Sequence, residues 1–257
     1  MVKLIDTHAH LQFEKFDSDR DAVIKRNSKA LFAIINPGAD LDSSKKGVQL
    51  AQKVSNFYAA IGVHPHHVDH WNKTYLPKLE GLIQKPKVVA VGEIGLDFHE
   101  YVGYPKPNLA KQIKILIPQI EMARDYKKPI LFHCRKAYDE LYEVIKPYKP
   151  LAGLVHCFMG DFATAQKFID LGLLISFAGN LTYKTNTHMQ EAAKSLPEEK
   201  ILVETDSPYL TPEPLRGERN EPINVLLIAK KIAALRKTTI ENVANFSNQN
   251  ARELFKL

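Results

Sequence analysis

Eight apolar, β-rich segments alternate along the chain with segments of helical periodicity, and this alternation constrains the fold more than any other feature. We predict strands at Val2–Leu11, Leu31–Pro37, Phe57–His64, Val88–Phe98, Pro129–Arg135, Ala152–Phe158, Leu173–Asn180 and Ile201–Leu210. We predict helices at Asp19–Lys29, Leu41–Val54, Thr74–Gln84, Asn108–Tyr126, Ala137–Ile145, Asp161–Leu171, Thr187–Leu196, Pro222–Leu235 and Ile240–Lys256. Such alternation indicates a parallel sheet, and eight units favour a closed (β/α)₈ TIM barrel of the α/β class over an open sheet.

The chain is expected to form a single domain over residues 1–257. Its length of 257 residues and hydrophobic content of 45% suit one barrel, and no Pro/Gly/Ser-rich linker divides it. It contains no apolar run of the roughly 18 residues that a membrane helix requires. The first ten residues carry polar groups where a signal peptide needs an apolar stretch. We therefore expect a soluble cytoplasmic protein without a membrane partner.

The net charge and the cysteines restrict the function less sharply. A net charge of +6 and a sequence pI near 9.1 suit a polyanionic partner such as nucleic acid, although lysines scattered on helix faces would produce the same balance. Two cysteines, Cys134 and Cys157, suggest no disulfide framework. Each follows a histidine in a predicted strand, so alternation directs both toward the helices as packing residues.

Imidazole and carboxylate groups stand near the C-terminal ends of five predicted strands. His8 and His10 are two residues apart, so both rings project from one face of the first strand. The C-terminal ends of barrel strands meet at one mouth, where active sites form. Nitrogen and oxygen ligands of this kind bind divalent metals such as Zn²⁺, Mn²⁺ or Mg²⁺. The six candidate metal ligands are His8, His10, Glu93, His133, His156 and Asp206.

Glu93 is the candidate around which the others are arranged. It lies in VVAVGEIGLDF, residues 88–98, whose first four residues are typical of a strand buried on both faces. A carboxylate at the end of such a strand is costly unless it meets a cation or a proton. We therefore expect Glu93 to be the central, bridging metal ligand and a catalytic residue.

Three further residues are candidates for catalysis. Glu204 and Asp206 share one face of the eighth strand, and adjacent carboxylates repel each other unless a cation or proton neutralises one. We expect Asp206 to hold the attacking water or take its proton, and Glu204 to orient the site from beneath. His64 ends the third strand and either contacts substrate, transfers a proton or simply occupies a turn. The polar loop with His66, His67 and His70 is expected to be solvated.

Three arginines are candidates for substrate binding. Arg135 shares the inward face of His133 and suits bidentate contact with a phosphate. Arg216 and Arg219 lie in the long loop after the eighth strand, where barrels often bind phosphate, although a salt-bridged loop fits them equally well. Candidates for stacking on bases near the mouth are Phe98, Tyr101, Tyr104 and Tyr209. Pro118 is expected to bend or break the helix over Asn108–Tyr126.

At these residues the sequence resembles the TatD family of metal-dependent deoxyribonucleases, within the wider group of amidohydrolase-like barrels. The resemblance covers essentially the whole chain and departs from the family at Met159, at Pro118 and in the loop from His99 to Lys106. It rests on IDTHAHL at 5–11, GVHPH at 62–66, GEIGLDF at 92–98, HCRKA at 133–137, VHCFMGD at 155–161, ISFAGN at 175–180, ETDSPYL at 204–210 and RGERNEP at 216–222.

The resemblance implies a TIM-like barrel with two divalent metal ions per subunit. One ion would be held by His8, His10, Glu93 and Asp206, and the other by Glu93, His133 and His156. The activity implied is hydrolysis of DNA phosphodiester bonds, including 3′-5′ exonuclease trimming of single-stranded ends, with DNA as the partner. Apart from the resemblance, we expect a monomer rather than an oligomer.

Two other functions stay open on these residues. A binuclear hydrolase of small phosphoesters, amides or lactones is one, because a barrel does not dictate its substrate. A non-catalytic nucleic-acid-binding barrel is the other. It would be expected to have a damaged ligand set, whereas this chain retains all six candidates.

Overall fold

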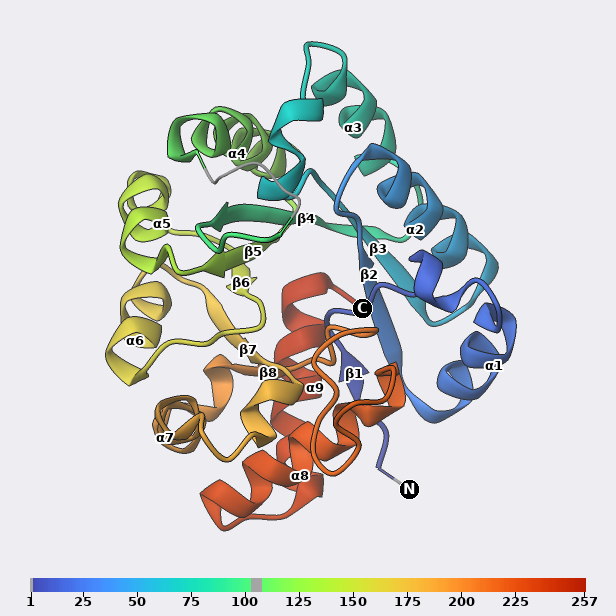
Figure 1. Cartoon of the computed structure of the whole chain (residues 1–257), viewed down its shortest axis with the longest axis vertical. Helices are drawn as coiled ribbons and strands as arrows, with labels where there is room; N and C mark the ends of the chain where they lie inside the picture. Colours follow the sequence, from blue (N-terminus) through green and yellow to red (C-terminus); the bar gives the residue numbers. More distant parts are fainter. Residues whose placement is uncertain (1, 103–107) are drawn as a thin grey trace.

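Eight parallel strands follow one another around a barrel in the order of the sequence, with helices outside them (Figure 1). The computed structural model describes residues 2–102 and 108–257. The strands are β1 Ile5–Asp6, β2 Ala33–Pro37, β3 Phe57–Ile61, β4 Val88–Asp97, β5 Ile130–Arg135, β6 Gly153–Val155, β7 Leu174–Phe177 and β8 Ile201–Val203. The α-helices are α1 Arg20–Ala30, α2 Leu41–Lys53, α3 Tyr75–Ile83, α4 Leu109–Asp125, α5 Tyr138–Ile145, α6 Phe162–Asp170, α7 Thr187–Ser195, α8 Val225–Arg236 and α9 Ile240–Phe255. The predicted (β/α)₈ barrel is confirmed.

The barrel is nearly closed, and its seam lies between β8 and β1. Seven neighbouring strand pairs form parallel ladders, whereas the seam is joined by a hydrogen bond of 3.3 Å from the Thr7 amide to the Val203 carbonyl and by an isolated bridge between Ala9 and Ser207. Several strands, β1, β6 and β8 among them, are shorter than predicted. The segments that follow β1 and β8 are irregular because they turn into the barrel mouth instead of continuing the ladder.

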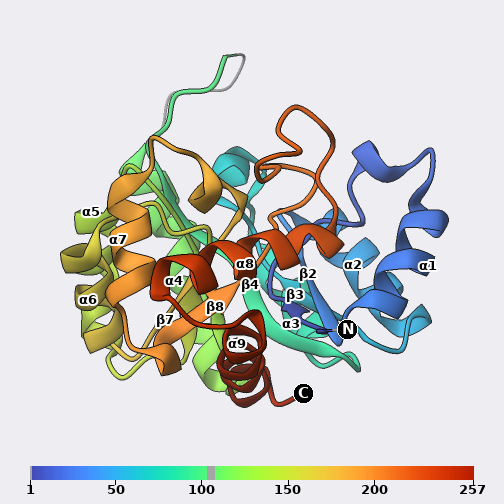
Figure 2. The same cartoon turned by 90° about the horizontal axis from the view of Figure 1, so that it is seen from below.

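Two apolar layers build the core. The larger layer fills the space between the outside of the sheet and the surrounding helices. The smaller one fills the barrel interior and continues onto Ala251 and Phe255 of α9. Figure 2 shows α9 below one end of the barrel, while the loop that follows β8 projects at the other end. Helix α9 therefore closes one end, and the opposite end stays accessible. The interior layer comprises Ile5, Ala33, Ile35, Ala60, Ala90, Leu131, Leu154 and Leu202.

Helix α4 runs without interruption through Pro118, so of the two predicted outcomes, a bend or a break, the break is wrong. A proline inside a helix removes one hydrogen bond and costs about 3 kcal/mol. Two buried glutamines on either side of it anchor the helix to the sheet. Gln112 accepts from the Asp97 amide at 3.0 Å and donates to its carbonyl at 2.8 Å. Gln119 accepts from the Val63 amide at 2.7 Å and donates to its carbonyl at 3.2 Å. These tertiary contacts offset the lost bond.

Within the described residues, no helix combines the length and apolar character needed to cross a membrane.

Candidate metal centre

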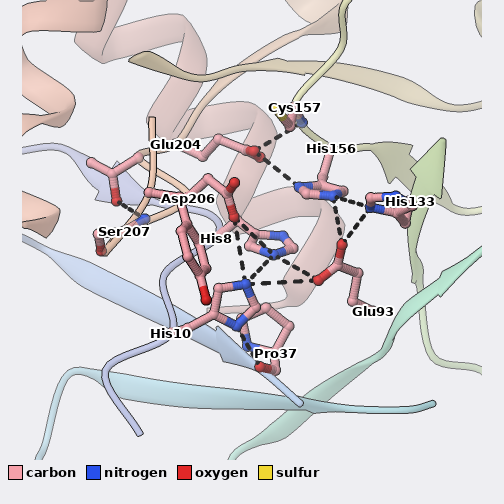
Figure 3. Close-up of polar contacts among 12 residues, drawn as sticks. His8, His10, Pro37, Glu93, His133, His156, Cys157, Glu204, Asp206 and Ser207 are labelled. Carbon is pink, nitrogen blue, oxygen red and sulfur yellow. Dashed lines mark hydrogen bonds and ion pairs between the residues drawn. The ribbon is translucent and has the colours of Figure 1, made fainter. Parts of the chain in front are cut away.

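Glu93 occupies the middle of the barrel mouth (Figure 3). The pairing of β4 with β5 shifts register between Val91 and Ile94, and such an irregularity redirects a side chain from the regular alternation. The Glu93 amide donates to the Gly38 carbonyl at 2.9 Å, and its side chain is buried. At Gly95 a Cβ atom would lie 1.9 Å from the His133 carbonyl oxygen, so the close approach of β4 to β5 requires glycine. The strand thereby carries the carboxylate to the centre of the mouth.

One oxygen of Glu93 faces a first group of ligand atoms. Glu93 Oε2 lies 3.4 Å from His8 Nε2 and 3.7 Å from His10 Nε2. The two imidazole nitrogens are themselves 3.1 Å apart. Asp206 Oδ1 completes the group at 3.8 Å from His8 Nε2 and 3.5 Å from His10 Nε2. These four residues come from the segments after β1 and β8 and from β4.

The other oxygen of Glu93 faces a second group. Glu93 Oε1 lies 2.7 Å from His133 Nδ1 and 2.8 Å from His156 Nε2. These two nitrogens are 3.1 Å apart. His64 Nε2 approaches the same oxygen at 3.5 Å. The structure thus brings all six sequence-predicted ligands together. It divides the five besides Glu93 between the two oxygens of its carboxylate, and it adds His64 to the second group.

The donor set fits a divalent cation in each group. Ligands that bind a zinc-like ion at about 2.0–2.2 Å stand roughly 3.0–3.5 Å from one another. The His8–His10, His8–Glu93 and His10–Asp206 separations of the first group and the His133–His156 separation of the second lie in this range. Two ring nitrogens that face each other can share at most one proton, whereas a cation satisfies both. Groups of this composition, such as His8, His10 and Asp206, have ligand atoms within 4.8 Å of one another. The protein's own residues therefore suit metal binding.

The ring nitrogen opposite the ligand atom is hydrogen-bonded in three of the four histidines predicted as metal ligands. His10 Nδ1 is 3.1 Å from the Pro37 carbonyl oxygen. His156 Nδ1 is 3.2 Å from Glu204 Oε1, and His133 Nε2 is 2.9 Å from Asp97 Oδ2. Such partners fix the tautomer and the direction of a metal-binding imidazole. Glu204 thus lies behind His156 and does not face Glu93 directly, in line with its expected orienting role.

Asp97 is a site residue that the sequence interpretation missed. It is fully buried at the end of β4 and accepts hydrogen bonds from His133 and from the His99 amide, the latter at 2.7 Å. His66 Nε2 also lies 3.0 Å from Asp97 Oδ2. Burial opposes its ionisation, but the hydrogen bonds from His133 and His66 hold the pKa of Asp97 far below its ordinary value. The alternation from Glu93 through Gly95 to Asp97 was the signal that could have revealed it.

The charges of the centre keep Glu93 ionised. Burial works against ionisation, but nearby imidazoles, His156 foremost, hold the pKa of Glu93 well below its ordinary value. Burial likewise opposes a charge on His156, yet the carboxylates of Glu93 and Glu204 raise its pKa well above the usual range. Burial and the neighbouring His133 lower the pKa of His64 well below that range. The centre therefore combines an ionised carboxylate with imidazoles of unequal basicity.

Sequence and structural comparisons identify the family of the chain. A sequence profile of the family described as TatD related DNase matches residues 5–256. The chain belongs to this family. It is 34% identical to the uncharacterized metal-dependent hydrolase YabD of Bacillus subtilis, over 99% of this chain and 99% of that protein. It is 31% identical to a 3'-5' ssDNA/RNA exonuclease TatD of Erwinia amylovora, over 99% and 100% of the two chains. The crystal structure of the TatD homologue YjjV from Escherichia coli K12 superposes with a TM-score of 0.91 at 29% identity, covering 99% of this chain and 98% of that one.

As a TatD-family member the chain is a metal-dependent hydrolase that acts on ester bonds, and the predicted resemblance is confirmed. Its centre opens into a cleft of about 920 Å³. Lys15 and Arg135 contribute positive charge to the cleft wall. The aromatic residues of the wall are Phe13, Tyr101, Tyr183 and Tyr209.

Two of the four predicted stacking residues thus line the cleft of this TatD-family hydrolase. Phe98 packs against the core instead, and Tyr104 lies outside the described residues. Sequence reasoning missed Phe13 and Tyr183, whose loop positions carried no periodic signal. Met159, the departure from the TatD pattern, is exposed at the cleft wall.

Two other expectations are corrected by the structure. His66 does not lie free in a solvated loop, because the short helix at Pro65–His70 turns its ring onto Asp97. Cys134 packs in the core as expected. Both cysteines border the cleft, but Cys157 does not join the apolar core, and Asn180 Nδ2 lies 3.7 Å from its sulfur. Its backbone has a φ of 45°, so strand alternation no longer holds at this residue.

The three predicted substrate-binding arginines occupy different places. Arg135 lines the cleft and donates to the Tyr101 hydroxyl. Arg216 lies on the surface, with its guanidinium 4.3 Å from the centre of the Tyr183 ring. Arg219 is not brought to the cleft wall. Its two terminal nitrogens donate to Asp19, each at 2.7 Å, because the loop after β8 folds back onto the start of α1.

Proposed function

We propose that this TatD-family hydrolase cleaves phosphodiester bonds of DNA and trims single strands from the 3′ end, using two divalent metal ions bridged by Glu93. The observation that carries the proposal is the division of the Glu93 carboxylate between two groups of imidazoles at the barrel mouth. The first ion would be held by His8, His10, Glu93 and Asp206, and the second by Glu93, His133 and His156. Mixed nitrogen and oxygen ligands suit Zn²⁺ or Mn²⁺, and the carboxylates also accept Mg²⁺.

Metal ions at these ligands would lower the pKa of a bound water and offset the charge that develops on the phosphoryl group. Asp206 is the base of the proposed reaction, because its carboxylate borders the cleft beside the first group and retains partial exposure. It holds the attacking water and accepts its proton. Glu204 keeps Nε2 of His156 directed at Glu93 by binding the opposite ring nitrogen. His64 lines the cleft beside the second group, with Nε2 3.5 Å from Glu93 Oε1, and would contact a substrate bound there or transfer a proton.

Several features support a nucleic-acid strand as the substrate. The cleft combines positive side chains with aromatic rings, a combination that suits single strands, whose phosphates and bases are both accessible. The positive net charge of +6 favours encounter with a polyanion. The Erwinia amylovora relative is named a 3'-5' ssDNA/RNA exonuclease. Arg135 is the arginine of this chain placed to contact a phosphate, with Arg216 at the rim. We further propose that the protein is a cytoplasmic monomer.

The test uses metal-stripped full-length protein and single-stranded DNA labelled at either its 5′ or its 3′ end. Mg²⁺, Mn²⁺ and Zn²⁺ are titrated separately, and the products are sized on a denaturing gel. The expected result is metal-dependent shortening of the 5′-labelled strand in single-nucleotide steps and immediate release of the label from the 3′-labelled strand. Glu93→Ala should show neither.

A matched control is Glu80→Ala on α3, which removes a carboxylate from a helix and leaves the mouth unchanged. Strands that stay intact under every metal, together with hydrolysis of a small phosphodiester, would replace this proposal with a small-substrate hydrolase. Equal cleavage of a matched RNA strand would extend the substrate class to RNA.

A further inference from the structure

One wall of the cleft is built from two chain segments that meet beside His10. Phe13 belongs to the segment after β1, and its ring lies flat on His10, with ring centres 4.3 Å apart and planes inclined by 10°. Tyr209 belongs to the segment after β8, and its ring stands edge-on to His10 at 6.5 Å. Both rings line the cleft, and Tyr209 is 42% exposed. Two aromatic surfaces thus border the first ligand group of the metal centre.

A positive charge accompanies this wall. Lys15 Nζ lies 4.5 Å from the centre of the Tyr209 ring, and Lys15 also lines the cleft. A cation–π contact at an exposed site is weak, and a phosphate attracts an ammonium group more strongly than a ring does. A bound strand would therefore draw Lys15 onto its phosphate and leave the ring face to a base.

Arg219 holds the two segments of the wall together. It donates to the backbone carbonyl of Lys15 at 2.9 Å, and its guanidinium lies 4.6 Å from the ring centre of Phe16. The same group pairs with Asp19 through both terminal nitrogens. Because Arg219 belongs to the loop after β8 and its partners belong to the segment after β1, the wall is assembled before any substrate arrives.

The other aromatic residues of the cleft are engaged differently. The Tyr183 ring lies under the Arg216 guanidinium at 4.3 Å, and its hydroxyl donates to the Thr211 carbonyl at 3.0 Å. Tyr101 makes edge contacts with His66 at 4.5 Å and with His99 at 4.4 Å. Among the described residues of the cleft, the wall of Phe13 and Tyr209 combines two rings, a cation and direct contact with a candidate metal ligand.

We propose that Phe13, Tyr209 and Lys15 form a nucleotide subsite, in which the rings stack a base adjacent to the cleaved bond and Lys15 pairs with a neighbouring phosphate. The inference rests on the proposed nuclease function and names the part of the cleft that recognises the strand. The subsite selects single-stranded substrate, because a base can reach the rings only when it is unpaired from a complementary strand. Stacking on rings tolerates all four bases, so little sequence preference follows.

The test measures binding apart from cleavage. Short single strands carry the fluorescent base 2-aminopurine at the last, second or third position from the 3′ end, and phosphorothioate linkages slow their hydrolysis. Stacking on an aromatic ring quenches this base. Wild-type protein is expected to quench one position selectively. Tyr209→Ala should abolish that quenching and weaken binding by about 5- to 150-fold, while Tyr209→Phe should retain the quenching.

Lys15→Gln should keep the quenching but reduce the slope of log K against log salt by about 0.7, the value for one lost contact with a single-strand phosphate. The matched controls are Tyr148→Ala and Lys146→Gln. They change a tyrosine and a lysine in the short 3-10 helix that follows α5, away from the cleft wall. Unchanged quenching and affinity in Tyr209→Ala, or an equal loss in Tyr148→Ala, would overturn the subsite.

Cleavage of unmodified strands separates this inference from the proposed function. If the wild-type protein trims DNA and Tyr209→Ala trims it equally well, the subsite is wrong and the nuclease stands. If the wild-type protein trims no strand but quenches through Tyr209, the nuclease is wrong and the subsite stands. Removing the base at the stacked position should lower the kcat/KM of the wild-type protein. The fall should equal the one that Tyr209→Ala causes on the normal strand. For Tyr209→Ala, kcat/KM should be the same on the strand without that base as on the normal strand.

Discussion

The buried carboxylate of Asp97 lies 2.9 Å from Nε2 of His133, on the side of the imidazole opposite to Glu93. His133 therefore presents Nδ1 to Glu93, at 2.7 Å, while Asp97 holds the far nitrogen. A histidine fixed at both ring nitrogens has one tautomer and one direction, which is what a metal ligand requires.

Replacement of Asp97 by alanine should weaken metal binding by about 10- to 100-fold, the usual effect of losing such an outer partner. The ring of His133 would lose its fixed orientation, although its own ligand atom remains. Metal titration with a chromogenic chelator as competitor measures the change. Asp125→Ala at the exposed end of α4 serves as the control. Metal affinity equal to that of the wild-type protein would show that Asp97 has no positioning role.

Variants of Glu93 and of Asp206 should lose different amounts of bound metal. Glu93 faces both groups, so Glu93→Gln is expected to reduce the metal content at both and to abolish turnover. Asp206 contacts only the first group, so Asp206→Asn should abolish turnover but retain metal at His133 and His156. Mass spectrometry of metal content after dialysis distinguishes the two. Equal metal loss in both variants would contradict the division of the Glu93 oxygens between two ions.

The ion-pair network around Arg219 should make stability depend on pH in acid. Arg219 lowers the pKa of Asp19, and Arg26 outweighs burial to lower the pKa of Glu221. A carboxyl whose folded pKa is depressed stabilises the fold above its unfolded pKa, and this contribution is lost as pH falls through the folded value. The free energy of unfolding should thus decrease when the pH is lowered below about 4.

Arg219→Gln tests the source of this dependence. The variant should be less stable than the wild-type protein at pH 7, and the difference should shrink toward pH 2. Urea denaturation across that range measures it. Because these pairs are partly exposed, high salt should also reduce the difference. A difference that is constant with pH would assign the effect of Arg219 to packing on Phe16 instead of to charge.

Phe255 should be essential to the stability of the barrel but not to its chemistry. It is 3% exposed and continues the interior layer of the sheet from α9. Phe255→Ala should lower the free energy of unfolding by about 3–5 kcal/mol, through lost burial and the cavity that remains. Activity at low temperature should persist, because α9 lies at the end of the barrel opposite to the mouth (Figure 2). Loss of metal binding in the folded variant would show that the two ends are coupled.

The local periodicity of the sequence predicted most of the fold. Apolar runs and helical segments alternate eight times, and that information is contained within each segment. Element ends were less predictable. The segments after β1 and β8 leave the ladder early because they turn into the mouth. Pro118 lies within a continuous α4 because Gln112 binds the backbone of Asp97 in β4 and Gln119 binds that of Val63, just after β3. Such tertiary contacts override a local preference and carry no local signal.

The barrel and the residue types at its mouth follow from the sequence alone, because the C-terminal ends of the strands of a parallel barrel meet at one mouth even when they are far apart in the chain. The three-dimensional fold sets how those residues divide their contacts. It turned one oxygen of Glu93 to each group of imidazoles, set Asp97 behind His133, and joined Arg219 to Asp19 instead of to the cleft. These arrangements depend on distances between segments far apart in the chain. A pattern of residue types does not contain those distances.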